Sequence, residues 1–137
     1  MILLDTNVLS ALMQREPPAA VIAWLDAQPP ESLWISSVTL FEARYGIALL
    51  ADGRRKDALL HAFESLVGED LEHRVATFGS GAAEHAARLA ADRKRAGRPV
   101  DLRDTFVAGI ALAHGATLAT RNTRHFEDLP AVVDPWG

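Results

Sequence analysis

Three acidic residues stand at positions where a fold alone would favour apolar side chains. Asp5 follows the apolar run 2–4, Glu42 lies within a helical run of apolar residues, and Asp104 begins a largely apolar segment. A buried carboxylate is costly unless a positive charge compensates it. Two carboxylates about 4 Å apart also repel by roughly 4 kcal/mol at an effective dielectric constant of about 20. A divalent cation with oxygen ligands removes both penalties, so the three acids predict a metal-binding site.

Each acid also has a simpler explanation. Asp5 suits the N-cap of a following helix. Glu42 could pair with Arg44 or Arg121. Asp104 would favour the positive end of a helix dipole, an interaction worth about 0.3–1 kcal/mol. One shared cause nevertheless explains three misplaced acids better than three unrelated causes, so the metal site is favoured.

Other kinds of reactive site find little support. The chain has no cysteine, which excludes disulfides, cysteine-ligated zinc, iron–sulfur clusters and thiol nucleophiles. The phosphate-binding patterns GxGxxG and GxxxxGK[ST] and the nucleophile pattern GxSxG are absent. The five histidines show no metal-ligand spacing and are expected at the surface or at helix ends. The three tryptophans are scattered, which indicates packing rather than base stacking.

Short apolar runs alternate with helical stretches and must position these acids. Strands are expected at 2–4, 33–35, 73–78, 116–119 and 132–133, and helices at 8–13, 17–29, 38–50, 53–67, 82–96 and 102–114. This order predicts an α/β domain with a mostly parallel sheet. Ligands of such sheets gather beyond the carboxyl ends of the strands. Asp5, which ends the first strand, is therefore expected at that edge.

The helix over 38–50 is expected to bury one apolar stripe that contains Glu42. The stripe follows helical spacing and consists of Val38, Phe41, Tyr45, Ala48 and Leu49.

Size and charge limit the class of protein. The 137 residues match one domain, and 49% hydrophobic with 23% charged residues is typical of a globular chain. No apolar run reaches the roughly 20 residues of a membrane span, and the amino terminus has no basic leader, so we expect one cytoplasmic domain. The net charge of −4 argues against a protein that coats nucleic acid. Segment 73–125, however, holds nine basic and four acidic residues, a net charge of +5.

Four segments in a fixed order carry a resemblance to a known family. They are Ile2–Ser10, Ile35–Gly46, Asp104–Ala111 and Ala119–Phe126, with Trp136 near the end. Together they resemble the PIN-domain ribonucleases, in particular the VapC/FitB-like toxins of type II toxin–antitoxin pairs. The resemblance implies a single domain over residues 1–137. Its fold would be a three-layer α/β/α sandwich around a mostly parallel sheet of four or five short strands.

The resemblance also implies roles for individual residues. Asp5, Glu42 and Asp104 match acids that bind Mg²⁺ or Mn²⁺. Asn122 is assigned to the catalytic group, although many members have a fourth acid there, and Asp101 is interpreted as a helix cap. The supporting polar positions are Thr6, Asn7, Ser37 and Thr120, and the RNA-binding positions are Arg103, Arg121 and Arg124.

The implied activity is hydrolysis of phosphodiester bonds in RNA by an endoribonuclease toxin. The implied partners are RNA and a cognate antitoxin with a DNA-binding domain and a basic tail. That tail would cover a groove formed by the helices around 8–25 and 38–63. A homodimer is expected, and a tetramer or larger assembly with the antitoxin, with no membrane partner.

Two other functions stay open at this point. One is a regulatory PIN module that acts with a DNA-binding partner and has weak or absent nuclease activity, which the amide of Asn122 keeps in consideration. The other is a phosphatase of the haloacid-dehalogenase type with Asp5 as nucleophile. It is disfavoured because Asn7 stands where such enzymes have a second acid.

Overall fold

A five-stranded parallel sheet forms the centre of the computed structural model, which describes all of residues 1–137. The strands are β1 (Ile2–Leu4), β2 (Leu33–Ser36), β3 (Val75–Ala76), β4 (Thr117–Ala119) and β5 (Val132–Val133), in the order β3-β2-β1-β4-β5. Every neighbouring pair is parallel, and Leu3 lies opposite Trp34 on one side and Leu118 on the other. The predicted parallel sheet is confirmed.

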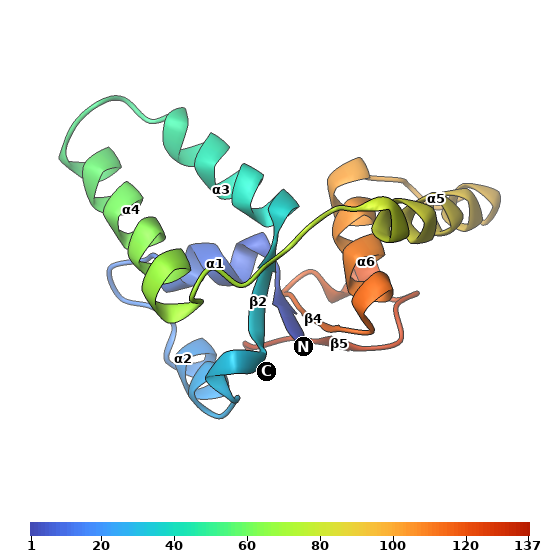
Figure 1. Ribbon diagram of the computed structural model, residues 1–137, viewed down its shortest axis with the longest axis horizontal. Helices are drawn as coiled ribbons and strands as arrows, with labels where there is room; N and C mark the ends of the chain where they lie inside the picture. Colours follow the sequence, from blue (N-terminus) through green and yellow to red (C-terminus); the bar gives the residue numbers. More distant parts are fainter.

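Helices cover both faces of the sheet (Figure 1). They are α1 (Thr6–Leu12), α2 (Ala19–Asp26), α3 (Ser37–Ala48), α4 (Arg54–Ser65), α5 (Ser80–Arg95) and α6 (Leu102–His114). Shorter turns occupy Pro30–Ser32, Leu66–Asp70 and Thr123–Phe126. Successive strand residues point to opposite faces, so Leu3 packs with α5 and α6 while Leu4 packs with α1, α3 and α4. The three-layer α/β/α architecture is therefore confirmed.

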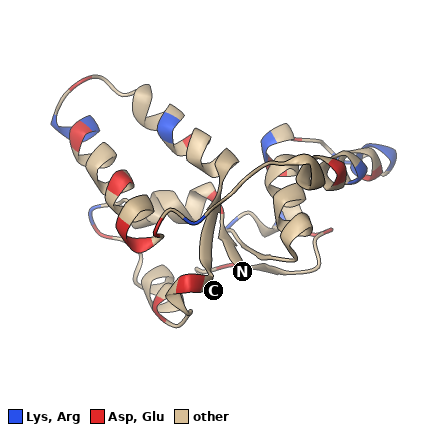
Figure 2. Cartoon of the chain, in the orientation of Figure 1, with Lys and Arg blue, Asp and Glu red and all other residues tan.

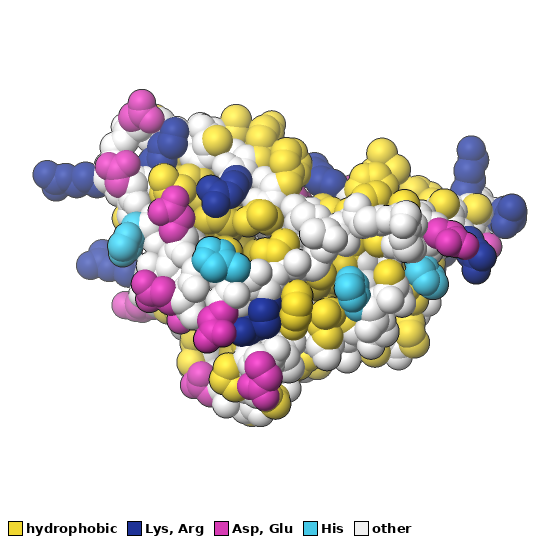
Figure 3. All heavy atoms as spheres, viewed as in Figure 1, with side chains coloured by type: hydrophobic (Ala, Val, Ile, Leu, Met, Phe, Trp, Pro, Cys, Tyr) yellow, Lys and Arg dark blue, Asp and Glu magenta, His cyan; other side chains and the backbone are white.

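Helix α3 buries a different stripe from the predicted one. Its buried residues are Thr39, Ala43 and Ile47, whereas Phe41, Tyr45 and Leu49 are 57%, 51% and 68% exposed. The Thr39 hydroxyl contacts those of Thr6 in α1 and Ser36 at the end of β2, and Ala43 and Ile47 join the apolar cluster on this side of the sheet. The larger apolar residues form an outer stripe, and Figure 3 shows hydrophobic side chains gathered along this side of α3.

Helices α5 and α6 form the tightest helix pair. A Cβ atom added to Gly109 of α6 would lie 2.5 Å from the Ala82 carbonyl oxygen and 2.7 Å from the Ala86 Cβ. Lys and Arg residues gather in the last turn of α5 (Figure 2). Helix α6 ends at Gly115, whose φ of 59° is the left-handed conformation that glycine adopts easily. None of the helices is both long enough and apolar enough to cross a membrane.

Candidate active site

Asp5 lies at the carboxyl end of β1, at the predicted edge of the sheet. It is the N-cap of α1, and its carboxylate Oδ1 accepts a hydrogen bond of 2.9 Å from the Thr6 backbone N–H. The other oxygen, Oδ2, accepts one of 2.8 Å from the Thr120 hydroxyl. The side chain is 6% exposed and has no cation partner. Asp5 is thus both the helix cap and a buried, uncompensated acid.

The pKa of Asp5 is raised above its usual value. Burial is the largest cause, because a carboxylate removed from water is harder to ionise. The hydrogen bonds from Thr120 and Thr6 lower this pKa, and the negative charges of Asp104 and Glu42 raise it. The three acids predicted to act together therefore interact electrostatically at one edge of the sheet.

Thr120 joins the acid to the loop that follows β4. Its hydroxyl donates to Asp5 and accepts from the Asn7 side-chain amide at 3.2 Å and from the Asn122 backbone N–H at 3.1 Å. Asn7 in turn accepts from the Arg121 backbone N–H through its Oδ1 at 3.1 Å. Asn7 and Thr120 therefore hold α1 and the β4 loop together around Asp5, as supporting residues would.

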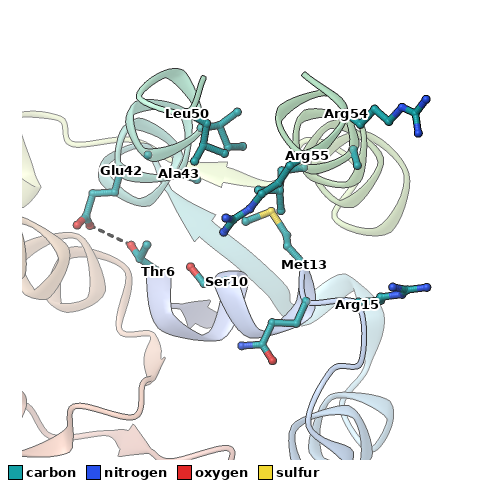
Figure 4. Close-up of a pocket in the computed structure, with 14 residues that line it drawn as sticks. Thr6, Ser10, Met13, Arg15, Glu42, Ala43, Leu50, Arg54 and Arg55 are labelled. Atoms are coloured by element: carbon teal, nitrogen blue, oxygen red, sulfur yellow. Dashed lines mark hydrogen bonds between the residues drawn. The ribbon is translucent and has the colours of Figure 1, made fainter. Parts of the chain in front are cut away.

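Glu42 reaches the site from α3. Its Oε1 accepts a 2.9 Å hydrogen bond from the Thr6 hydroxyl (Figure 4), and its Oε2 lies 3.6 Å from the Arg103 guanidinium. The ion-pair partner is therefore neither Arg44 nor Arg121, the two arginines considered from the sequence. Arg44 instead lies over the Phe63 ring, 5.0 Å from its centroid.

Asp104 lies in the first turn of α6 and its side chain is 28% exposed. Its Oδ2 lies 2.9 Å from Nδ1 of His125. Asp101 caps the same helix by accepting a 3.0 Å hydrogen bond from the Asp104 backbone N–H. This confirms Asp101 as a cap and adds His125, a residue that the sequence pattern did not single out.

The donor set suits a hard divalent cation, although the acids are not arranged as a complete binding site. Asp5, Glu42 and Asp104 supply carboxylate oxygens, which Mg²⁺ and Mn²⁺ prefer. No group of three His, Asp or Glu side chains is placed to hold an ion directly. Glu42 is paired with Arg103 and Asp104 with His125, so a cation would have to displace both partners.

The remaining residues predicted for the site differ in whether they contact the groups around the three acids. Ser37 takes no part in the hydrogen bonds around the acids, because its hydroxyl accepts from the Phe78 backbone N–H at 3.1 Å. Arg121 adjoins Thr120, and its guanidinium lies 4.9 Å from the Trp136 ring centroid. Arg124 lines a pocket that includes Asp104. The Asn122 side chain forms no hydrogen bond within the chain.

Comparisons with known proteins extend this description. A family model described as "PIN domain" matches residues 2–132. The chain is 44% identical to "Plasmid stability protein StbB" of Pseudomonas syringae pv. tomato, over 99% of both chains. It is 39% identical to "VapC ribonuclease Y4jK" of Sinorhizobium fredii, over 99% of this chain and 98% of the relative. It is 36% identical to "Toxin FitB" of Neisseria gonorrhoeae, over 99% of both.

Solved structures agree over the same extent. The structure of "FitAB bound to IR36 DNA fragment" superimposes with a TM-score of 0.90 at 35% identity, over 100% of this chain and 96% of that chain. A "Toxin-antitoxin complex from Klebsiella pneumoniae" gives 0.71 at 26% identity, over 98% of both chains. With its parallel sheet and its acids at the carboxyl edge, the chain belongs to the PIN-domain family, and its relatives are VapC- and FitB-like proteins.

Proposed function

We propose that the chain is a divalent-metal-dependent endoribonuclease that hydrolyses phosphodiester bonds in RNA and acts as the toxin of a toxin–antitoxin pair in the cytoplasm. One observation carries the proposal: Asp5 is a buried carboxylate without a cation partner, and two further acids raise its pKa. A fold does not need such an arrangement, whereas phosphodiester hydrolysis on a metal ion does. The relative named as a VapC ribonuclease supports RNA as the substrate.

Asp5, Glu42 and Asp104 would hold Mg²⁺ or Mn²⁺. When bound, such an ion polarises the scissile phosphate and lowers the pKa of a coordinated water. Thr6 orients two of these acids, because its backbone N–H bonds to Asp5 and its hydroxyl to Glu42. Thr120 fixes the second oxygen of Asp5. The Thr6 hydroxyl occupies one carboxylate oxygen of Glu42. The other oxygen, which lies beside Arg103, would be left for the cation.

Arginines at the same edge would bind the RNA backbone. Arg103 is 55% exposed and Arg121 is exposed while stacked on Trp136, so both guanidinium groups can meet phosphate. Arginine suits this role because its planar fork binds phosphate oxygens in pairs. Asn122 follows Arg121 directly, and its free amide would position a water or a phosphate oxygen.

Cleavage of single-stranded RNA by the purified chain tests the activity. We expect cleavage with Mg²⁺ or Mn²⁺, none with EDTA, and a loss of about 100-fold or more in Asp5→Asn, since metal chemistry contributes several kcal/mol. Asp26→Asn, at an exposed acid at the end of α2, is the matched control and should keep full activity. Full activity of folded Asp5→Asn would refute the proposed role of this residue. Absence of metal-dependent cleavage in the unchanged chain would favour the regulatory module instead.

A groove between α1, α3 and α4 is the proposed site of the antitoxin. It encloses about 960 Å³, and Thr6 and Glu42 line it together with Met13, Ile47 and Leu50 (Figure 4). An amphipathic helical segment would cover this apolar floor. At one end Glu42 would accept a basic side chain of the antitoxin tail, and that contact would block the metal site.

Arginines at the other end of the groove add a condition on this partner. Arg15, Arg54 and Arg55 also line the groove, so acidic side chains on the same segment would be favourable there. Co-purification with a DNA-binding protein encoded beside the gene tests the site. Leu50→Glu should abolish co-purification, whereas Arg88→Glu, on distant α5, should not. Equal recovery with both variants would place the antitoxin elsewhere.

The exposed stripe of α3 supports the expected homodimer. Phe41 and Tyr45 stack with ring centroids 5.8 Å apart, and Leu49 continues the stripe by one turn. Apolar side chains concentrated on one face are typical of an interface. Light scattering after gel filtration should give twice the monomer mass, and Tyr45→Lys should shift the protein toward monomer. A monomeric parent chain would contradict this assignment.

A further inference from the structure

A second, smaller pocket opens directly beside the acid site, and charged residues form most of its wall. It encloses about 330 Å³, and Pro99 is the one nonpolar residue among those that line it. Asp104 and His125 lie in its wall, joined by their 2.9 Å contact, so the pocket is continuous with the site of proposed cleavage. A volume at the lower end of the range of small-ligand pockets, about 300–1,000 Å³, suits one small polar group rather than a peptide helix.

The wall of this pocket is rigid. Arg93 is 4% exposed, and its guanidinium binds both oxygens of Asp128 at 2.8 Å. The same group donates to the His125 carbonyl oxygen at 3.1 Å. Arg93 therefore fixes α5 to the segment that carries His125. A rigid wall of this kind lowers the entropy lost when a ligand binds.

Two arginines of the pocket remain available to a ligand. Arg98 lies 3.2 Å from Asp128, but that carboxylate is already bound at both oxygens by Arg93. Arg124 forms no ion pair and no side-chain hydrogen bond. Asp101 and Glu127 stand among these cations, so the pocket offers acceptors as well as donors.

This mixture of donors and acceptors favours a nucleotide over a bare anion. Because Arg93 is paired with Asp128, Arg98 and Arg124 are the cations left for a ligand, and the nearby acids Asp101 and Glu127 would repel a bare phosphate. A nucleotide combines a phosphate, which arginines bind, with a base edge that carries donors and acceptors of its own. Proteins read single-stranded RNA by accepting unstacked bases in this way.

Resting on the proposed ribonuclease function, we propose that this pocket receives the nucleotide next to the scissile phosphate. Arg98 and Arg124 contact its phosphate oxygens, and Asp101 and Glu127 accept hydrogen bonds from its base. The pocket then selects the position at which the RNA strand is cut. Arg98 and Arg124 would be substrate-positioning residues, and the acids that bind the metal would be separate from them.

Binding of uncut RNA tests the pocket without relying on cleavage. The probe is a fluorescent 12-nucleotide single-stranded RNA of mixed sequence, titrated into Asp5→Asn protein that also carries Arg98→Ala or Arg124→Ala. We expect Kd to rise about five- to tenfold in each, with a smaller salt dependence because one phosphate contact is lost. Arg95→Ala is the matched control, since Arg95 lies three residues before Arg98, at the end of α5, but is 77% exposed and outside the pocket. Its Kd should stay within twofold of the parent.

Mapping of cut sites in a mixed RNA pool supplies the second readout, with Asp5 intact. Glu127→Gln, which alters a group proposed to accept from the base, should change the preferred nucleotide beside the cut, and Arg95→Ala should not. Unchanged binding in Arg124→Ala, which removes no contact within the protein, together with an unchanged cleavage pattern in Glu127→Gln, would overturn the proposal even if Arg98→Ala failed to fold. RNA binding that depends on the pocket but leads to no cleavage in the parent chain would instead refute the nuclease function alone.

Discussion

Replacement of Gly109 by alanine should destabilise the protein, although alanine is the better helix former. Gly109 lies in the middle of α6, where the change from glycine to alanine is worth up to about 1 kcal/mol in favour of the helix. At this position the added Cβ would lie 2.5 Å from the Ala82 carbonyl oxygen, 2.7 Å from the Ala86 Cβ and 3.0 Å from the Ala86 nitrogen. The optimal separation of such atoms is about 3.5–4.0 Å.

None of these neighbours can move aside alone. Two are backbone atoms of α5 and the third is a Cβ fixed to that backbone, so the helices must separate by roughly 1 Å. Overpacking of a core in this way costs about 1–3 kcal/mol. After subtraction of a gain of about 1 kcal/mol in helix propensity, we expect a net loss of up to about 2 kcal/mol. For a chain of this size the corresponding fall in Tm is up to about 8 °C.

Gly46 provides the matched control for this substitution. It also lies inside a helix, α3, but apart from the backbone of its own helix and its chain neighbours no heavy atom lies within 4 Å of the position of an added Cβ. Gly46→Ala should therefore raise stability by up to about 1 kcal/mol. Urea denaturation followed by circular dichroism measures both variants at equal protein concentration. If Gly109→Ala were as stable as Gly46→Ala, the close approach of α5 and α6 would be wrong.

Three further predictions concern charged groups. Arg93→Ala should lower the free energy of unfolding by about 3–5 kcal/mol, measured by urea denaturation, because it breaks a largely buried ion pair with Asp128. The hydrogen bonds from Arg93 lower the pKa of Asp128, so its stabilisation is present above pH 3.8 and is lost as the pH falls through the lower folded value. Burial raises the pKa of Asp5, so its contribution has the opposite sign: stability is gained as the pH falls from neutral toward 3.8. When the free energy of unfolding is measured against pH, Asp128→Asn should reduce its pH dependence below pH 3.8, and Asp5→Asn should reduce it between neutral pH and pH 3.8. A curve unchanged by either substitution would contradict the assignment. Arg103→Ala should tighten Mn²⁺ binding, measured by calorimetry, by up to about fivefold. Arg103 competes with the metal ion for Glu42, and an exposed ion pair of this kind is worth about 1 kcal/mol or less. Weaker Mn²⁺ binding would refute this prediction.

The order and type of the elements could be predicted because local signals agree with the fold. Apolar runs of three or four residues identify β1 and β2, and Gly115 marks the end of α6. The position of Asp5 also followed, since an acid that ends a parallel strand must lie at the carboxyl edge. Ser37 shows where such reasoning fails. Ser36, Ser37 and Thr39 are adjacent hydroxyls, and only the direction of each side chain decides which of them contacts Thr6.

The error on α3 has a specific physical cause. Two stripes run along this helix at the same spacing, one with Phe41 and Tyr45 and the other with Thr39 and Ala43. Hydrophobicity favours the first stripe as the buried one. The neighbouring elements decide otherwise, because Thr39 meets Thr6 of α1, and Ala43 joins the apolar cluster that contains Phe63 of α4. A sequence pattern contains no information about which elements lie beside α3, and the exposed aromatic stripe is then available for an interface.

The net charge of the chain is a poor guide to its binding partner, because it counts charged groups that are bound within the fold. The basic excess of segment 73–125 includes Arg93, which is buried against Asp128, and Arg74, whose guanidinium binds the carbonyl oxygens of Leu33 and Pro30. These cations hold the fold together and cannot meet RNA. The acids of the proposed metal site likewise contribute negative charge that a metal ion would neutralise. Subtracting both groups leaves a few arginines around the sheet edge, and their placement, rather than the net charge of −4, decides whether a phosphate backbone can approach.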